Sequence, residues 1–98
     1  MLNLTKSNFD STIAKGKVLV DFHTVWCGHC RIVEPVINEL AAKYAGSVVV
    51  AKVDADDERE ISNRFAIRNY PTIIVFEDGK EIARKIGAHP IEVFEAML

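Results

Sequence analysis

The chain has 98 residues, of which 49% are hydrophobic and 27% are charged, and its formal net charge at pH 7 is −2. We expect a single domain over residues 1–98, with a core that needs neither a metal nor a disulfide. The weakly acidic balance argues against nucleic acid as a partner, and no apolar run approaches the ~20 residues of a membrane helix. Residues 1–8 lack the pattern of a secretion signal, which predicts a cytoplasmic protein.

Apolar periodicity predicts alternating strands and helices in the first half of the chain. Residues 2–4 are expected to form a short edge strand, and Ser7 is expected to cap a short helix. The apolar run at 17–23 is typical of a central strand that is buried on both faces. A long helix follows the cysteines and ends before Gly46, and Pro35 inside it predicts a kink.

The second half continues this alternation and ends in a hairpin and a helix. Its predicted strands span residues 47–53, 72–76 and 81–86. Asp57 is expected to cap the intervening helix, with Glu60 completing a capping box. Asp78-Gly79 is a hairpin turn signal, and Pro90 suits the first turn of a closing helix. The order β-α-β-α-β-α-β-β-α predicts an α/β fold with a mixed central sheet flanked by helices, in which helical crossovers favour parallel pairing.

Both cysteines lie in the segment W-C-G-H-C, where a buried strand leads into a long helix. No other cysteine is available, so a disulfide here can only be local, and the pair is reactive or metal-binding rather than a staple. Unpaired N–H groups and the helix dipole favour an anion at Cys27, and a thiolate is the species that attacks a disulfide. Cys30, one turn further on, can resolve the mixed disulfide, and Gly28 lets a substrate backbone approach.

Further matches in the same order make the chain resemble the thioredoxin family over almost its whole length: V-D-F before the motif, W-C-G-x-C, Pro35, Lys52, Pro71-Thr72 and the late Gly87. The resemblance implies the thioredoxin fold and a redox-active Cys27–Cys30 disulfide, with no bound cofactor and no metal. It also implies protein disulfides as substrates and an electron donor of the thioredoxin-reductase type. We expect the protein to act as a monomer.

Asp21 is an acidic residue inside an apolar strand, and burial of its carboxyl should raise its pKa. The resemblance makes Asp21 the proton acceptor for Cys30, with Lys52 on the neighbouring strand as its partner. The alternative is a purely structural ion pair between Asp21 and Lys52.

The resemblance also implies a substrate surface around the cysteines. In the family, the proline at Pro71 is cis, packs against the cysteine pair and excludes metals, while the residue at Tyr70 offers backbone groups to an extended substrate. Trp26 is expected to flank and shield the cysteines, and Gly87 to leave room for the substrate backbone. Simple core packing of Trp26 and a plain strand-end role for Gly87 are the alternatives.

His29 stands where thioredoxins usually have proline and where protein disulfide isomerases have histidine. A protonated imidazole beside Cys27 would stabilise its thiolate and make the pair less reducing than ordinary thioredoxin. The alternative is an exposed residue without effect. We favour a reductase over an oxidant or isomerase, because the compartment and the electron donor decide the direction of electron flow more than the pair itself.

Two other classes of function remain open. Cys27 and Cys30 have zinc-ligand spacing, with His23 and His29 nearby, but zinc wants four ligands, so a zinc or iron–sulfur site would require a dimer. A thioredoxin-like domain can also serve as a binding module that does not use its thiols. We read His23 itself as a packing or solvent-linked residue that replaces a common aromatic of the family.

Overall fold

The computed structural model describes residues 1–98, and its elements follow the predicted order. The strands are β1 (Leu2–Asn3), β2 (Lys17–His23), β3 (Val48–Asp54), β4 (Thr72–Glu77) and β5 (Lys80–Ile86). The helices are α1 (Phe9–Ile13), α2 (Gly28–Lys43), α3 (Arg59–Arg64) and α4 (Ile91–Glu95). All five strands form one sheet in the order β1-β3-β2-β4-β5, so the predicted mixed sheet flanked by helices is confirmed.

Strand directions divide the sheet into two parts. β1, β3 and β2 pair in parallel, whereas β4 runs antiparallel to β2, and β5 antiparallel to β4. Although the helix α3 lies between β3 and β4, β4 does not run parallel to its neighbour β2. Parallel pairing is therefore confined to β1, β2 and β3. No helix is both long and apolar enough to cross a bilayer.

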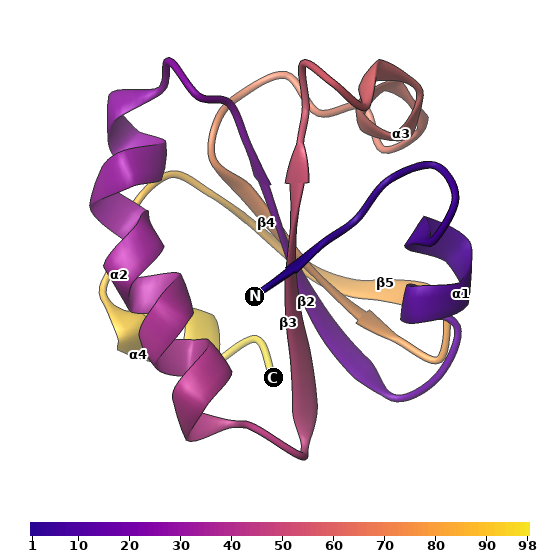
Figure 1. Cartoon of the computed structure of the whole chain (residues 1–98). Helices are drawn as coiled ribbons and strands as arrows, with labels where there is room; N and C mark the ends of the chain where they lie inside the picture. The colour runs from indigo at the N-terminus through magenta and orange to yellow at the C-terminus, as the bar shows by residue number, and fades with distance from the viewer.

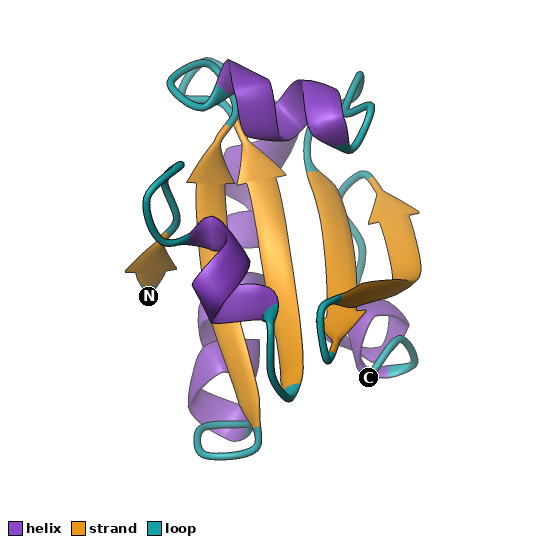
Figure 2. Cartoon of the chain, turned by 90° about the vertical axis from the view of Figure 1, so that its right-hand side faces the viewer, coloured by secondary structure: helices purple, strands orange, loops and turns teal.

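Helices cover both faces of the sheet (Figure 1). α2 and α4 lie on one face, and α1 and α3 lie on the other, where the sheet is seen behind them (Figure 2). Side chains alternate between the two faces along a strand, so a central strand covered on both sides has to be apolar throughout. In β2, Val18, Val20 and Phe22 enter one apolar cluster, while Leu19 enters the other.

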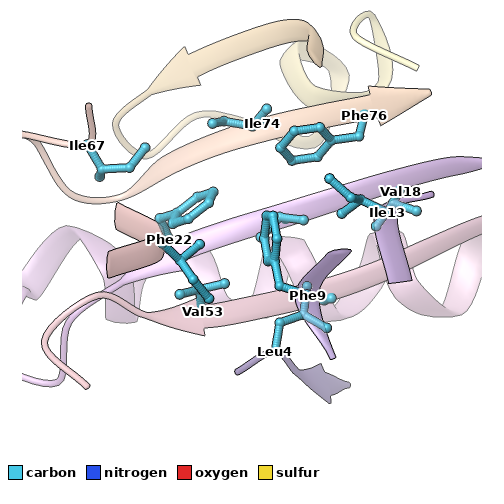
Figure 3. Packing of buried hydrophobic residues seen from close by; sticks show 12 residues of the cluster. Leu4, Phe9, Ile13, Val18, Phe22, Val53, Ile67, Ile74 and Phe76 are labelled. Atoms are coloured by element: carbon cyan, nitrogen blue, oxygen red, sulfur yellow. The ribbon is translucent and has the colours of Figure 1, made fainter. Parts of the chain in front are cut away.

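The two clusters differ in composition. On the α1–α3 face, the Phe9 ring centroid lies 5.5 to 6.4 Å from the ring centroids of Phe22, Phe65 and Phe76. Figure 3 shows Phe9 beside Phe22 and Phe76. We call this group the aromatic cluster; its buried members are Leu4, Phe9, Ile13, Val18, Val20, Phe22, Ala51, Val53, Ile61, Ile67, Ile74 and Phe76. On the α2–α4 face lies the aliphatic cluster, made of Leu19, Val33, Ile37, Leu40, Val50, Ile73, Val75 and Phe94.

The predicted capping box of α3 is wrong. The helix begins at Arg59 after Glu58, which makes no side-chain capping bond. The preceding turn is organised instead by Asp54, whose Oδ1 accepts the backbone N–H groups of Asp56 and Asp57 at 3.0 and 3.3 Å. Because Asp54 already binds these donors, the chain reaches its helical conformation later than Asp57.

α1 also begins later than predicted. Its N-cap is Asn8 rather than Ser7, and Asn8 makes no side-chain capping bond. The Asn8 Oδ1 atom accepts the Thr5 N–H at 2.7 Å, so this side chain closes the turn before the helix. The Ser7 hydroxyl is 2.9 Å from the Thr5 hydroxyl and does not cap the helix.

Candidate active site

The two cysteines lie where β2 has ended and α2 begins. Cys27 is the N-cap of α2, and its Sγ accepts the backbone N–H of Cys30 at 3.2 Å. Both are free thiols, and their side chains are largely buried. Gly28 and His29, the first two residues of α2, are exposed. The Cys27 sulfur therefore lies at the positive end of the helix dipole, next to the backbone of its partner.

The surroundings of Cys30 hold it as a thiol. Burial raises the pKa of the Cys30 thiol to about 12, and a hydrogen bond with Cys27 works in the same direction. A backbone hydrogen bond with Thr24 lowers this pKa but does not reverse the shift. At neutral pH Cys30 keeps its proton, and the proton has to be removed before the sulfur can attack a disulfide.

A loop that follows α3 packs against Cys27. The Tyr70–Pro71 peptide bond is cis, and the Cys27 thiol donates to the Tyr70 carbonyl at 3.5 Å. Pro71 is buried, and its carbonyl accepts the Gly87 N–H at 2.8 Å. Gly87 has a φ of 97°, which favours glycine, and a Cβ there would lie 3.4 Å from Nε2 of His89. The structure thus brings Cys27, Tyr70, Pro71 and Gly87 together from distant parts of the sequence.

Trp26 forms an exposed rim beside this loop. Its side chain is 65% exposed, so simple core packing is the wrong interpretation. The indole Nε1 donates to Oδ2 of Asp56 at 2.7 Å, and the indole ring packs edge-on against Tyr70 with centroids 6.1 Å apart. Sequence reasoning missed Asp56, because nothing in an acidic turn indicates which carboxylate will meet an indole.

Asp21 lies beneath the cysteines and is 4% exposed. Burial raises its pKa to about 7; Lys52 opposes this shift and Glu34 adds to it. Asp21 and Lys52 are partners in the register of β2 and β3, but none of the ion pairs within 4 Å joins their side chains. The Oδ1 atom of Asp21 has no hydrogen-bond partner in the protein. A direct structural ion pair is therefore absent, and the carboxyl changes its protonation state near neutral pH.

A cavity of about 260 Å³ connects Asp21 to Cys30. Its lining residues are Met1, Asp21, His23, Thr24, Val25, Cys30, Arg31, Glu34 and Lys52. Sequence reasoning did not identify Thr24, which is buried with an unpartnered Oγ1, or Glu34. The spacing from Cys30 to Glu34 was the available signal, because residues four apart share one side of a helix.

Metal-ligating side chains do not gather in the structure. No group of three or more His, Cys, Asp and Glu residues is arranged to hold a metal ion. The site consists instead of two unequal thiols at a helix N-terminus, a cis-proline loop against one and a buried carboxyl near the other. This combination, on a mixed sheet covered by helices, defines a protein of the thiol–disulfide exchange class.

Comparison with known proteins gives the family. The family model described as Thioredoxin matches residues 1–98. Proteins named thioredoxin from Staphylococcus haemolyticus and Staphylococcus saprophyticus are each 39% identical over 92 residues, which cover 94% of this chain and 88% of each relative. The thioredoxin of Staphylococcus aureus is 37% identical over the same shares. The chain belongs to the thioredoxin family and is a disulfide oxidoreductase.

Proposed function

We propose that this protein reduces disulfide bonds in other proteins through a reversible Cys27–Cys30 disulfide, with a potential less reducing than that of ordinary thioredoxins. The observation that carries the proposal is that the two cysteine sulfurs lie in different environments, one that favours an anion and one that favours a thiol. Cys27 Sγ lies at a helix N-terminus and accepts a backbone N–H, which favours an anion. Cys30 is held as a thiol with a pKa of about 12. Cys27 is therefore suited to attack the substrate disulfide, and Cys30 remains a thiol until the second step.

The reaction follows from this difference in two steps. The Cys27 thiolate attacks one sulfur of the substrate disulfide, forms a mixed disulfide and expels the other sulfur as a thiolate. The Asp21 carboxylate then takes the proton of Cys30, whose sulfur attacks Cys27 and releases the second substrate thiolate. Two electrons pass to the substrate, its thiolates take up two protons, and the protein is left as the Cys27–Cys30 disulfide. Lys52 assists by favouring the charged form of Asp21.

The same geometry supports a binding path for an extended substrate segment. The segment lies along Tyr70 and Pro71, whose loop contacts the Cys27 sulfur, and passes Gly87, which has no side chain in its way. The exposed Trp26 offers a large apolar surface on the other side, and Gly28 leaves the approach to Cys27 open.

His29 is the residue proposed to set the potential. It is exposed in the first turn of α2, one residue from Gly28 and two from Cys27. A tenfold shift towards the thiolate is worth at most about 30 mV for a two-electron couple, against about 90 mV between thioredoxin and protein disulfide isomerase. An imidazolium at His29 therefore accounts for a fraction of that range. We expect a monomeric cytoplasmic reductase recharged by a flavoprotein of the thioredoxin-reductase type.

Insulin reduction tests the proposed roles of the cysteines. Cys27→Ser should abolish turnover, whereas Cys30→Ser should accumulate a covalent mixed disulfide that is visible on a non-reducing gel. Ala42→Ser, an exposed position on the same helix, is the matched control and should keep the wild-type rate. Wild-type turnover by Cys27→Ser would overturn the proposal.

A redox titration against glutathione tests the proposed role of His29. His29→Pro should lower the potential by up to about 30 mV, because it removes an imidazole that would stabilise the Cys27 thiolate if protonated. An unchanged or higher potential would show that His29 is an exposed residue without effect. A second candidate function, oxidation or isomerisation of disulfides, is favoured by the same histidine. It would be supported if the wild-type protein oxidised a reduced unfolded protein faster than it reduced insulin.

A further inference from the structure

The proposed reaction leaves a proton on a buried carboxyl. Asp21 is 4% exposed, so the proton that it takes from Cys30 has to travel to solvent before Asp21 can act again. The cavity of about 260 Å³ beside Asp21 is the space through which the proton can leave. A polar cavity needs only about 10–15 Å³ to admit one water molecule, so this one has room for a hydrogen-bonded path.

Two titratable side chains line this cavity between the reacting pair and the surface. His23 lies two residues beyond Asp21 on β2, so the two side chains point to the same face of the sheet. Glu34 lies four residues beyond Cys30 on α2, so the two share one side of the helix. Exposure increases along the series, because Asp21 is buried, His23 is half-buried and Glu34 is exposed.

We propose that His23 and Glu34 relay the proton between Asp21 and solvent across this cavity. The inference rests on the role proposed above for Asp21. The protonated Asp21 carboxyl gives its proton to the neutral imidazole of His23, and the imidazolium passes it to the Glu34 carboxylate, which loses it to water. Each O–H or N–H bond that breaks is matched by one that forms, and no electrons are transferred.

Other charged groups also line the cavity. They are Lys52 on β3 and Arg31 on α2, which are basic side chains and do not form part of the proposed relay. Burial lowers the pKa of His23 from its usual value; Asp54, its partner on β3, and Glu34 work against this shift, and Lys52 adds to it. His23 is thus mostly neutral at pH 7 and can accept a proton.

Unpaired polar atoms mark the inner end of this route. Asp21 Oδ1 and Thr24 Oγ1 are both buried and have no hydrogen-bond partner in the protein, and both residues line the cavity. Buried polar groups are nearly always paired with protein or water, so these two atoms are available to hydrogen-bond to water that enters the cavity.

Carboxyl NMR measures the exchange directly, without substrate. In the reduced, ¹³C-labelled protein, the Asp21 carboxyl carbon reports its own protonation, and its line width at the titration midpoint reports the rate of proton exchange. His23→Gln/Glu34→Gln should slow this exchange at least tenfold, which broadens or splits a signal that is averaged in the wild type. Each protein is compared at its own midpoint, because removal of Glu34 also lowers the pKa of Asp21.

The matched control is Glu39→Gln. It makes the same change in charge on the same helix but lies outside the cavity lining, so the wild-type exchange rate should persist. The single variant Glu34→Gln alters only an exposed side chain and should alone slow exchange several-fold, which provides a test if the double variant does not fold. Wild-type exchange in either relay variant would overturn the inference.

Separate measurements test the relay and the proposed role of Asp21, so one can be wrong while the other holds. If Asp21→Asn leaves the step from mixed disulfide to Cys27–Cys30 disulfide unchanged in single-turnover kinetics, the role proposed for Asp21 is wrong, whatever the exchange rate is. If that variant slows the step while the relay variants keep wild-type exchange, only the relay is wrong. Slow exchange in the relay variants together with a slow step in Asp21→Asn supports both.

Discussion

The two faces of the sheet differ in whether their buried polar groups have hydrogen-bond partners. On the face of the aromatic cluster, the buried hydroxyls are paired: Ser62 donates to the Glu58 carbonyl at 3.1 Å and Thr72 to the Asn69 carbonyl at 2.6 Å. On the other face, the aliphatic cluster gives way at one end to the Asp21 carboxyl and to a cavity of about 260 Å³. There Asp21 Oδ1 and Thr24 Oγ1 remain unpaired.

This difference suggests that one face of the sheet mainly provides stability, whereas the other carries the reactive groups. A fully paired, densely packed face gains stability from burial without any cost from unsatisfied atoms. A buried carboxyl without a partner destabilises the folded state, but its pKa of about 7 lets it exchange a proton at neutral pH. Residues that break the general rules of burial are expected at functional sites, and here they lie on one face only.

The largest effect on stability is expected from the aromatic cluster. Phe9→Ala removes a ring that is 1% exposed and contacts three other rings, so it should lower the free energy of unfolding by about 3–5 kcal/mol. Urea denaturation at pH 7 measures the loss as a lower midpoint with an unchanged slope. In the folded fraction, the alkylation rate of Cys27 should stay at its wild-type value.

The control for this substitution is Val49→Ala in β3, at a side chain that is 45% exposed. It should cost less than about 1 kcal/mol, since little apolar surface leaves the protein interior. A loss at Phe9 no larger than that at Val49 would contradict the division, because the aromatic face would then not carry the stability assigned to it.

A somewhat smaller effect, with a defined pH window, is expected from Asp21. Its folded-state pKa of about 7 exceeds the ordinary value of 3.8 that is expected in the unfolded chain, so the folded protein binds more protons than the unfolded chain between these pH values. The free energy of unfolding should therefore fall as pH rises from about 4 to 7, by up to about 4 kcal/mol. Asp21→Asn should remove this fall, as denaturation curves from pH 4 to 8 would show.

Asp57→Asn, which changes an exposed carboxylate, serves as the control and should keep the wild-type pH profile. If Asp21→Asn also kept that profile, the charge of Asp21 would not oppose folding. The contrast between a satisfied face and an unsatisfied one would then lose its energetic basis.

Features that depend on local pattern could be predicted from the sequence. The strand at Lys17–His23 was predicted because burial on both faces leaves a continuous apolar run. The cysteine pair was placed at a helix start because the pattern changes from strand to helix at Trp26. The caps of α1 and α3 were predicted wrongly, since the turns before these helices are closed by Asn8 and Asp54, and each helix begins later than residue preferences indicate.

Features that depend on segments meeting in space were beyond the sequence. Glu34 and Thr24 line one cavity with Asp21 because residues of α2 and of the end of β2 meet there. The spacing from Cys30 to Glu34 places both on one side of the helix but does not indicate that Asp21 faces that side. The Gly87 N–H reaches the Pro71 carbonyl because β5 pairs with β4 in a particular register. Such contacts follow from the tertiary arrangement, so the sequence singled out Pro71 and Gly87 but not the hydrogen bond that joins them.

The smallest effect is expected at the rim, where the exposed Trp26 makes one hydrogen bond and one edge-on aromatic contact. Trp26→Phe deletes the N–H that donates to Asp56 at 2.7 Å but keeps an aromatic ring against Tyr70. With Asp56→Ala it completes a double-mutant cycle, for which we expect a coupling energy of about 1 kcal/mol in urea denaturation. A cycle of Trp26→Phe with the neighbouring Asp57→Ala should give no coupling. Coupling above about 3 kcal/mol would mean that the rim contributes to stability as a buried network does. Stability would then not be concentrated on the face of the aromatic cluster.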